Sequence, residues 1–156
     1  MNEHVAIKKP ASPDYDADGY GWAMAQSKFI REGLMDEVDW KNVAEEIETM
    51  GRNERGALES HLLQIAIHML KWDVQPERRG RSWYVTISSQ RVQALRVLTK
   101  NPSLKPALPE MVAEAMEDAR RLAAIETNIP EKRFDLIEYA QDEIFNRPFE
   151  WTGEGD

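Results

Sequence analysis

Four residues combine chemically useful side chains with positions that interrupt a helical apolar pattern: Glu46, Glu59, His68 and Arg91. At about 100° per residue along a helix, Glu59 falls inside a broad apolar arc, and His68 lies at the edge of the same arc. Arg91 lies in the middle of the apolar arc of the next predicted helix. A charged side chain directed at a core needs a partner, because an unpaired buried charge costs several kcal/mol. These positions therefore predict a polar cluster.

The cluster allows two interpretations. In the first, Arg91 pairs with Glu59 or Glu46 across two helices, and the pair fixes the register of the helices. Buried ion pairs specify packing more often than they catalyse, which favours this interpretation. In the second, the cluster and His61 form a pocket that binds an anion or activates water, as in a hydrolase or a nuclease-like enzyme. The sequence contains no complete catalytic constellation, so no catalytic residue is assigned.

Metal binding is not expected. His61 and His68 are seven residues apart, which places them two turns, or about 10 Å, apart along a helix. Two side chains at that separation do not reach one ion on a straight helix. Helical bundles that bind two iron ions use Glu-x-x-His motifs on paired helices, and the sequence contains no such motif. We therefore assign no metal ligand and no cofactor.

A second candidate site is the basic and aromatic segment from Arg78 to Tyr84. Residues 71–105 carry a net charge of +6 in a chain of net charge −8, so the remaining residues carry −14. Arginines beside aromatic rings bind phosphates and stack on bases, whereas arginines near a helix C-terminus also stabilise that terminus. The acidic chain makes nucleic acid an unlikely partner. The candidate residues for binding an anion or a protein partner are Arg78, Arg79, Arg81 and Trp83.

The elements that position these residues are predicted to be helices, because apolar residues recur at three-and-four spacing and no segment alternates with period two. We expect an all-α, single-domain bundle of about five main helices and a short C-terminal helix. Asp16 or Asp18 and then Asp39 are the expected N-caps of the first two helices. The expected spans are 18–32, 39–51, 53–72, 82–101, 103–128 and 138–145.

Residue types that favour helix boundaries set these limits. Gly51 is expected to end or bend the second helix, and Ser82 and Ser103 are expected to open two later ones. Four residues share one face of the helix over 39–51: Trp40, Val43, Ile47 and Met50. The bundle is predicted over 14–150, with a flexible arm at 1–13 and a tail at 151–156.

Composition narrows the class of protein. The chain has 156 residues, which suits one domain, and 42% of them are hydrophobic and 31% charged, as in a globular protein. It contains no Cys, which excludes disulfides and fits a reducing cytoplasm. Charged residues interrupt every apolar run before it reaches bilayer length, so neither a signal peptide nor a membrane span is expected.

Several short blocks resemble a bacterial family, domain of unknown function family twenty-nine. The resemblance extends from about Tyr15 to Phe149. The most characteristic blocks are Ala44-Glu45-Glu46-Ile47-Glu48, His68-Met69-Leu70-Lys71-Trp72, Gln75-Pro76-Glu77-Arg78-Arg79 and Asn101-Pro102-Ser103-Leu104-Lys105. Asp73 departs from the family pattern, in which Gln is expected. The resemblance implies an all-helical protein of a bacterial cytoplasm and brings no assigned reaction, cofactor or substrate.

The sequence and the resemblance therefore predict a non-enzymatic helical protein of the bacterial cytoplasm, an interaction or accessory domain that works through contact with a protein, including another copy of itself. Two alternatives remain open: an enzyme that uses the Glu/His/Arg pocket, and a weak RNA binder that uses the basic and aromatic segment.

Overall fold

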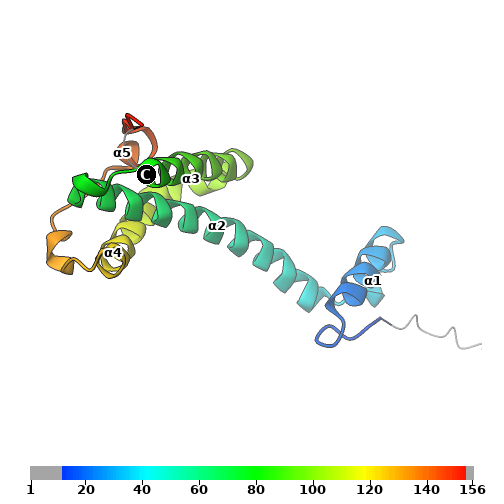
Figure 1. The fold of residues 1–156 in the computed structure, drawn as a ribbon. Coiled ribbons are helices and arrows are strands. Elements are labelled where there is room, and N and C mark those ends of the chain that lie inside the picture. Colours follow the sequence, from blue (N-terminus) through cyan, green and yellow to red (C-terminus); the bar gives the residue numbers. More distant parts are fainter. Residues whose placement is uncertain (1–11, 154–156) are drawn as a thin grey trace, which may run out of the picture. The chain divides into compact units, whose positions relative to one another are not determined.

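The computed structural model describes residues 12–153, and every regular element in this range is helical (Figure 1). The α-helices are α1 (Gly19–Arg31), α2 (Trp40–Val74), α3 (Arg81–Lys100), α4 (Leu108–Thr127) and α5 (Gln141–Asn146). Short 3₁₀ helices lie in the connections at Met35–Glu37, Pro76–Arg78, Pro102–Ala107 and Glu131–Arg133. The predicted all-α class is confirmed. None of the helices described is long and apolar enough to cross a membrane.

The contacts between residues divide the chain into two compact units. The N-terminal unit is Met1–Gly51 and the C-terminal unit is Arg52–Asp156. Of the predicted arm over 1–13, residues 1–11 lie outside the described residues, as do residues 154–156 of the predicted tail.

In the N-terminal unit, both ends of α1 follow from local side-chain and backbone chemistry. Asp18 is the N-cap, and its Oδ1 accepts a hydrogen bond of 2.8 Å from the amide of Gly21. Gly33 follows the helix with a φ of 73°, in the left-handed region that glycine adopts at little cost. The amide of Leu34 donates to the carbonyl of Phe29 at 2.9 Å, which closes the helix end in a Schellman arrangement.

Helix α2 begins as predicted but does not end as predicted. Asp39 caps it, since its Oδ1 accepts from the amide of Asn42 at 3.3 Å. The sequence predicts that Gly51 ends or bends this helix. The predicted end is wrong, because α2 continues through Gly51 to Val74. A glycine inside a helix costs about 1 kcal/mol relative to alanine, which the surrounding helix formers tolerate. Gly51 also lacks the positive φ that would turn the chain away.

The C-terminal unit is built around one hydrophobic core. The residues 58–72 of α2 supply its central side chains, α3 and α4 pack against them, and Phe134, Tyr139 and Ile144 complete the core from the chain after α4. Phe134 is fully buried, although it lies in an irregular connection. This connection and α5 are therefore anchored parts of the fold.

Two predicted helix starts in this unit are wrong by a few residues. Helix α3 begins at Arg81 after Gly80, and Ser82 does not cap it. The helix expected from Ser103 begins instead at Leu108, after a 3₁₀ helix. Prolines at 106 and 109 explain the delay, because proline lacks an amide hydrogen and clashes with the preceding turn of an α-helix. The predicted end at Asn128 is confirmed, with this residue in the left-handed conformation.

Candidate functional site

Arg91 binds main-chain carbonyls, and the predicted pairing of Arg91 with a glutamate is wrong. Its Nε donates to the carbonyl of Ile144 at 2.7 Å, its Nη1 to that of Arg147 at 2.7 Å, and its Nη2 to that of Glu143 at 2.9 Å. The last carbonyls of a helix have no partner within the helix and carry partial negative charge. A planar guanidinium with a fork of donors suits this group of oxygens. Arg91 therefore caps the C-terminal end of α5.

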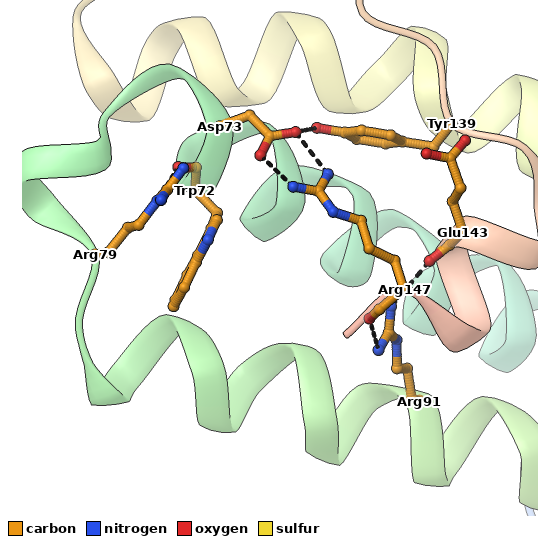
Figure 2. Close-up of polar contacts among 7 residues, drawn as sticks. All are labelled: Trp72, Asp73, Arg79, Arg91, Tyr139, Glu143 and Arg147. Atoms are coloured by element: carbon orange, nitrogen blue, oxygen red, sulfur yellow. Dashed lines mark hydrogen bonds and ion pairs between the residues drawn. The ribbon is translucent and has the colours of Figure 1, made fainter. Parts of the chain in front are cut away.

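Asp73, at the end of α2, is the carboxylate that holds the same segment from the other side (Figure 2). Arg147 donates to both Asp73 oxygens with N–O distances of 2.7 Å. The hydroxyl of Tyr139 donates to Oδ2 of Asp73 at 2.6 Å. The ring of Phe149 has Arg91 and Arg147 within 5.2 and 5.0 Å of its centre. These contacts form a latch, defined here as Asp73, Arg91, Tyr139, Arg147 and Phe149.

The ionisation of the latch is set by burial and by its hydrogen bonds. Burial alone would raise the pKa of Asp73, but the bonds from Arg147 and Tyr139 outweigh burial and lower that pKa. Burial and the carboxylate of Asp73 strongly raise the pKa of Tyr139. The bond to Asp73 raises the pKa of Arg147, whereas burial and the nearby Arg147 lower the pKa of Arg91. Asp73 and Arg147 are thus a charged pair, and Tyr139 is a neutral donor.

The remaining members of the predicted polar cluster each have a separate partner. Glu59 accepts from Nε of Arg55 at 2.7 Å on the same helix. Nδ1 of His68 lies 2.8 Å from the carbonyl of Gln64, and burial lowers the pKa of His68. Glu46 belongs to the N-terminal unit and accepts a hydrogen bond from the hydroxyl of Tyr15. Among the residues described, no hydrogen bond or ion pair joins any two of these four predicted residues.

His61, which the pocket interpretation adds to the cluster, lies beside Gln90. Its Nδ1 is 2.6 Å from Oε1 of Gln90. Within residues 12–153, no three side chains of His, Cys, Asp or Glu lie close enough together to hold a metal ion.

The basic and aromatic segment divides into two parts. Nε of Arg79 donates to the carbonyl of Trp72 at 2.8 Å, and its guanidinium lies 5.3 Å from the centre of the Trp72 ring. The ring of Trp83 has Nζ of Lys71 at 5.0 Å from its centre. Arg79 and Trp83 therefore make contacts within the fold. Arg78, at the end of the 3₁₀ helix Pro76–Arg78, and Arg81, the first residue of α3, are exposed.

The latch residues Asp73, Tyr139 and Arg147 were not predicted as a group. Asp73 stood out only as a departure from the family pattern, and 66 positions separate it from Tyr139. The one feature of the sequence that points to this region is Arg91, a cation on an apolar helix face that requires hydrogen-bond acceptors nearby.

A different candidate site lies on the N-terminal unit, where α1 and the first turns of α2 face each other. A groove of about 510 Å³ separates them, and its apolar walls come from Ala23 and Ile30 on α1 and from Val43, Ile47 and Met50 on α2. We call this surface the N-terminal groove. Ile47 is 64% exposed and Met50 is 69% exposed. The predicted apolar face of this helix is therefore present, but its side chains at 47 and 50 are not in a core.

The walls of the groove are held by a buried amide. Gln26 on α1 is only 3% exposed, and its Oε1 accepts from the amide of Asp39 at 2.8 Å. Nε1 of Trp22 lies 3.4 Å from Oδ2 of the same aspartate, and the Trp22 ring packs edge-on against Tyr15. The N-cap of α2 is thereby fixed to α1. Because α1 is fixed at the point where α2 begins, the groove is a preformed surface.

Electrostatically, the groove carries both signs of charge. Arg31 and Glu46 line it together with the apolar side chains. The surface offers apolar area and charges of both signs, and its lining includes one hydroxyl, that of Ser27, and one carboxylate, that of Glu46. Such an arrangement suits binding to another polypeptide.

Comparison with known proteins places the chain in a family without supplying a relative of known activity. No curated protein and no solved structure matched. One family model, described as Domain of unknown function DUF29, matches residues 15–150. That range includes both candidate sites, the latch and the N-terminal groove, and nearly the whole chain. The protein belongs to this family of domains of unknown function.

Proposed function

We propose that the protein is a non-enzymatic interaction domain of the bacterial cytoplasm that binds a protein partner through the N-terminal groove. The observation that carries this proposal is the exposure of Ile47 and Met50 on a rigid apolar groove. Contiguous exposed apolar surface is unfavourable in water unless another surface covers it. The mixed charges of Arg31 and Glu46 beside that surface suit the polar rim of a protein interface.

The enzyme alternative receives less support from the geometry. It requires Glu46, His68 and Arg91 to share one water-accessible pocket. In the residues described, Arg91 donates to three carbonyls, His68 is bonded to its own helix, and Glu46 is bonded to Tyr15. Each of the three groups is therefore engaged in a separate contact.

The RNA alternative would depend mainly on Arg78 and Arg81, because the third exposed arginine, Arg79, is bonded to the carbonyl of Trp72. Trp83 is a poor stacking platform, because Lys71 lies over its ring. A few exposed cations beside a tryptophan that already contacts a lysine make a small contribution to binding single-stranded nucleic acid.

A photo-crosslinking experiment tests the proposal in cells. A photoreactive p-benzoylphenylalanine replaces Ile47, and in a control it replaces Ile125, which is 76% exposed on α4. We expect a light-dependent adduct with a polypeptide at position 47 and none at position 125. Absence of an adduct at position 47, or equal labelling at both positions, would contradict a docking role for the groove.

A further inference from the structure

The N-terminal unit buries very little of its own apolar surface. Its buried apolar side chains are Trp22, Phe29 and Val38, and the only other buried side chain described there is that of Gln26. A unit of the size of Met1–Gly51 buries only a modest share of its surface, and units below about 40 residues usually rely on disulfides, metals or oligomerisation. The chain has no Cys, and no metal-binding group is present among the residues described. Covering the exposed apolar side chains of the unit with another surface would add to its stability.

The groove has the residue pattern of half of a helical bundle. On α2 the apolar residues Val43, Ile47 and Met50 follow a spacing of four and then three, which places them in one stripe. On α1 Ala23 and Ile30 are seven residues apart and form a facing stripe. Two helices with facing apolar stripes bury them when two more helices close the arrangement.

We infer that the occupant of the N-terminal groove is the same groove of a second copy of this chain, so that two hairpins of α1 and the start of α2 form an intermolecular four-helix bundle. This inference rests on the proposed function and names its partner. A two-fold dimer brings one surface against an identical one, so each stripe of one copy supplies the apolar residues that the other lacks. Both a cation, Arg31, and an anion, Glu46, line the groove, so each copy can meet the charges of the other with opposite ones.

The composition of the groove favours a second copy over a strongly charged or extended partner. A partner recognised by charge would require one sign to dominate the rim. An extended peptide that binds by strand addition would require free main-chain groups at a sheet edge, and the unit is helical throughout its described regular elements. A helical partner with an apolar face and charges of both signs fits the groove, and the same groove of a second copy has these properties.

The test measures self-association of the full chain. Sedimentation velocity is recorded from micromolar to millimolar protein for the unaltered chain, for Ile47→Lys and Met50→Lys in the groove, and for Ile125→Lys on α4 as a matched control. The three positions are exposed, so each variant is expected to fold, and circular dichroism checks that it does. We expect a dimer for the unaltered chain and for the control. Each groove substitution should weaken the dimer by about a hundredfold, because a two-fold interface contains every substitution twice.

A second measurement uses the absence of native cysteine. Met50→Cys places a single thiol in the groove, and a short bifunctional maleimide should join two chains into a species of twice the 18.0 kDa mass. Leu136→Cys, at a residue that is 95% exposed, is the control: it keeps the groove intact but should not be cross-linked, so on a denaturing gel it should run as a single chain of 18.0 kDa.

The outcomes separate the inference from the proposed function. A chain that is monomeric at every concentration overturns the inference, as does a dimer that survives both groove substitutions. If the chain is monomeric but the photoreactive residue at 47 captures a different protein, the interaction function stands and the second copy is the wrong partner. If the chain is monomeric and position 47 captures nothing, both ideas fail.

Discussion

Asp73 and Arg147 lie 74 positions apart in the sequence, and their side chains meet in a two-pronged ion pair with N–O distances of 2.7 Å. Their side chains are 25% and 29% exposed, so the pair is shielded from most of the solvent. Charge-assisted, two-pronged pairs of this kind are stronger than ordinary hydrogen bonds. The pair joins the end of α2 to the chain that follows α5.

Asp73→Asn should make the protein less stable at neutral pH and less sensitive to acid. The bonds that lower the pKa of Asp73 stabilise the folded state above the ordinary value of 3.8, and this stabilisation is lost as the pH falls through the lower, folded-state pKa. We expect a loss of about 2 kcal/mol in the free energy of unfolding at neutral pH, because the substitution leaves Arg147 without its anion. Urea unfolding at neutral pH and below pH 3.8 measures both effects.

Asp135→Asn is the control for that experiment, since Asp135 is exposed and the substitution removes the same charge. An equal acid response in both variants would mean that net charge, and not the latch, governs acid unfolding.

Arg91→Gln should release α5 from the bundle. The substitution removes three hydrogen bonds from a cation to main-chain carbonyls, which is expected to cost about 2–3 kcal/mol. Arg91→Lys should restore only part of this, because one ammonium group does not reproduce a planar fork. Amide hydrogen exchange over residues 141–149 should accelerate in both variants, and more in Arg91→Gln.

Arg96→Gln, at an exposed position of the same helix, should leave that exchange unchanged. If exchange over 141–149 were the same in Arg91→Gln and in the unaltered chain, the capping role of Arg91 would be refuted.

His68 should titrate below its ordinary pKa of 6.5, because burial disfavours the charged imidazole. Between the folded-state pKa and 6.5, the unfolded chain binds more protons than the folded chain, so stability rises with pH across that interval. NMR titration of the imidazole signal, assigned by its absence in His68→Gln, checks the direction. The same variant should show a flatter rise of stability in that interval. A His68 pKa at or above 6.5 would contradict the prediction.

Alanine substitutions should have opposite effects at two glycines. A Cβ on Gly21 would lie 2.3 Å from Oδ2 of Asp18, so Gly21→Ala disrupts the N-cap of α1 and should lower the melting temperature. Gly51 has nothing within 4 Å of the same atom and lies inside α2, so Gly51→Ala should stabilise by up to about 1 kcal/mol. Thermal unfolding followed by circular dichroism measures both. A rise in melting temperature for Gly21→Ala would show that the cap is dispensable.

Local chemistry explains which parts of the fold could be predicted. Three features depend only on residues within one helical turn and can therefore be predicted from the residue types: the cap at Asp18, the turn at Gly33 and the end of α4 at Asn128. The continuity of α2 through Gly51 could not be predicted from local residue types. Glycine is compatible both with a helix end and with a helix interior, and the difference depends on the backbone conformation that the rest of the chain selects.

The candidate sites show the same division. Helical periodicity correctly singled out Arg91 as a cation that needed a partner, but the partners that it finds are backbone carbonyls, which every residue carries. Because helical periodicity shows only where side chains lie, it predicts side-chain partners for Arg91, namely Glu46 or Glu59. The apolar stripe through Val43, Ile47 and Met50 was visible in the sequence. Whether a stripe is covered by its own chain or left exposed depends on tertiary packing, which periodicity does not encode.

The contacts of Arg91 also bear on how this region can vary through evolution. Arg91 donates hydrogen bonds to the main-chain carbonyls of residues 143, 144 and 147, so changes of side chain at those positions leave its hydrogen bonds in place. An aligned set of related sequences should therefore show an arginine at this position that is retained without any co-varying partner. Asp73 and Arg147, which bind through side chains, should instead change together. Two interactions on the same segment would thus leave different evolutionary signatures.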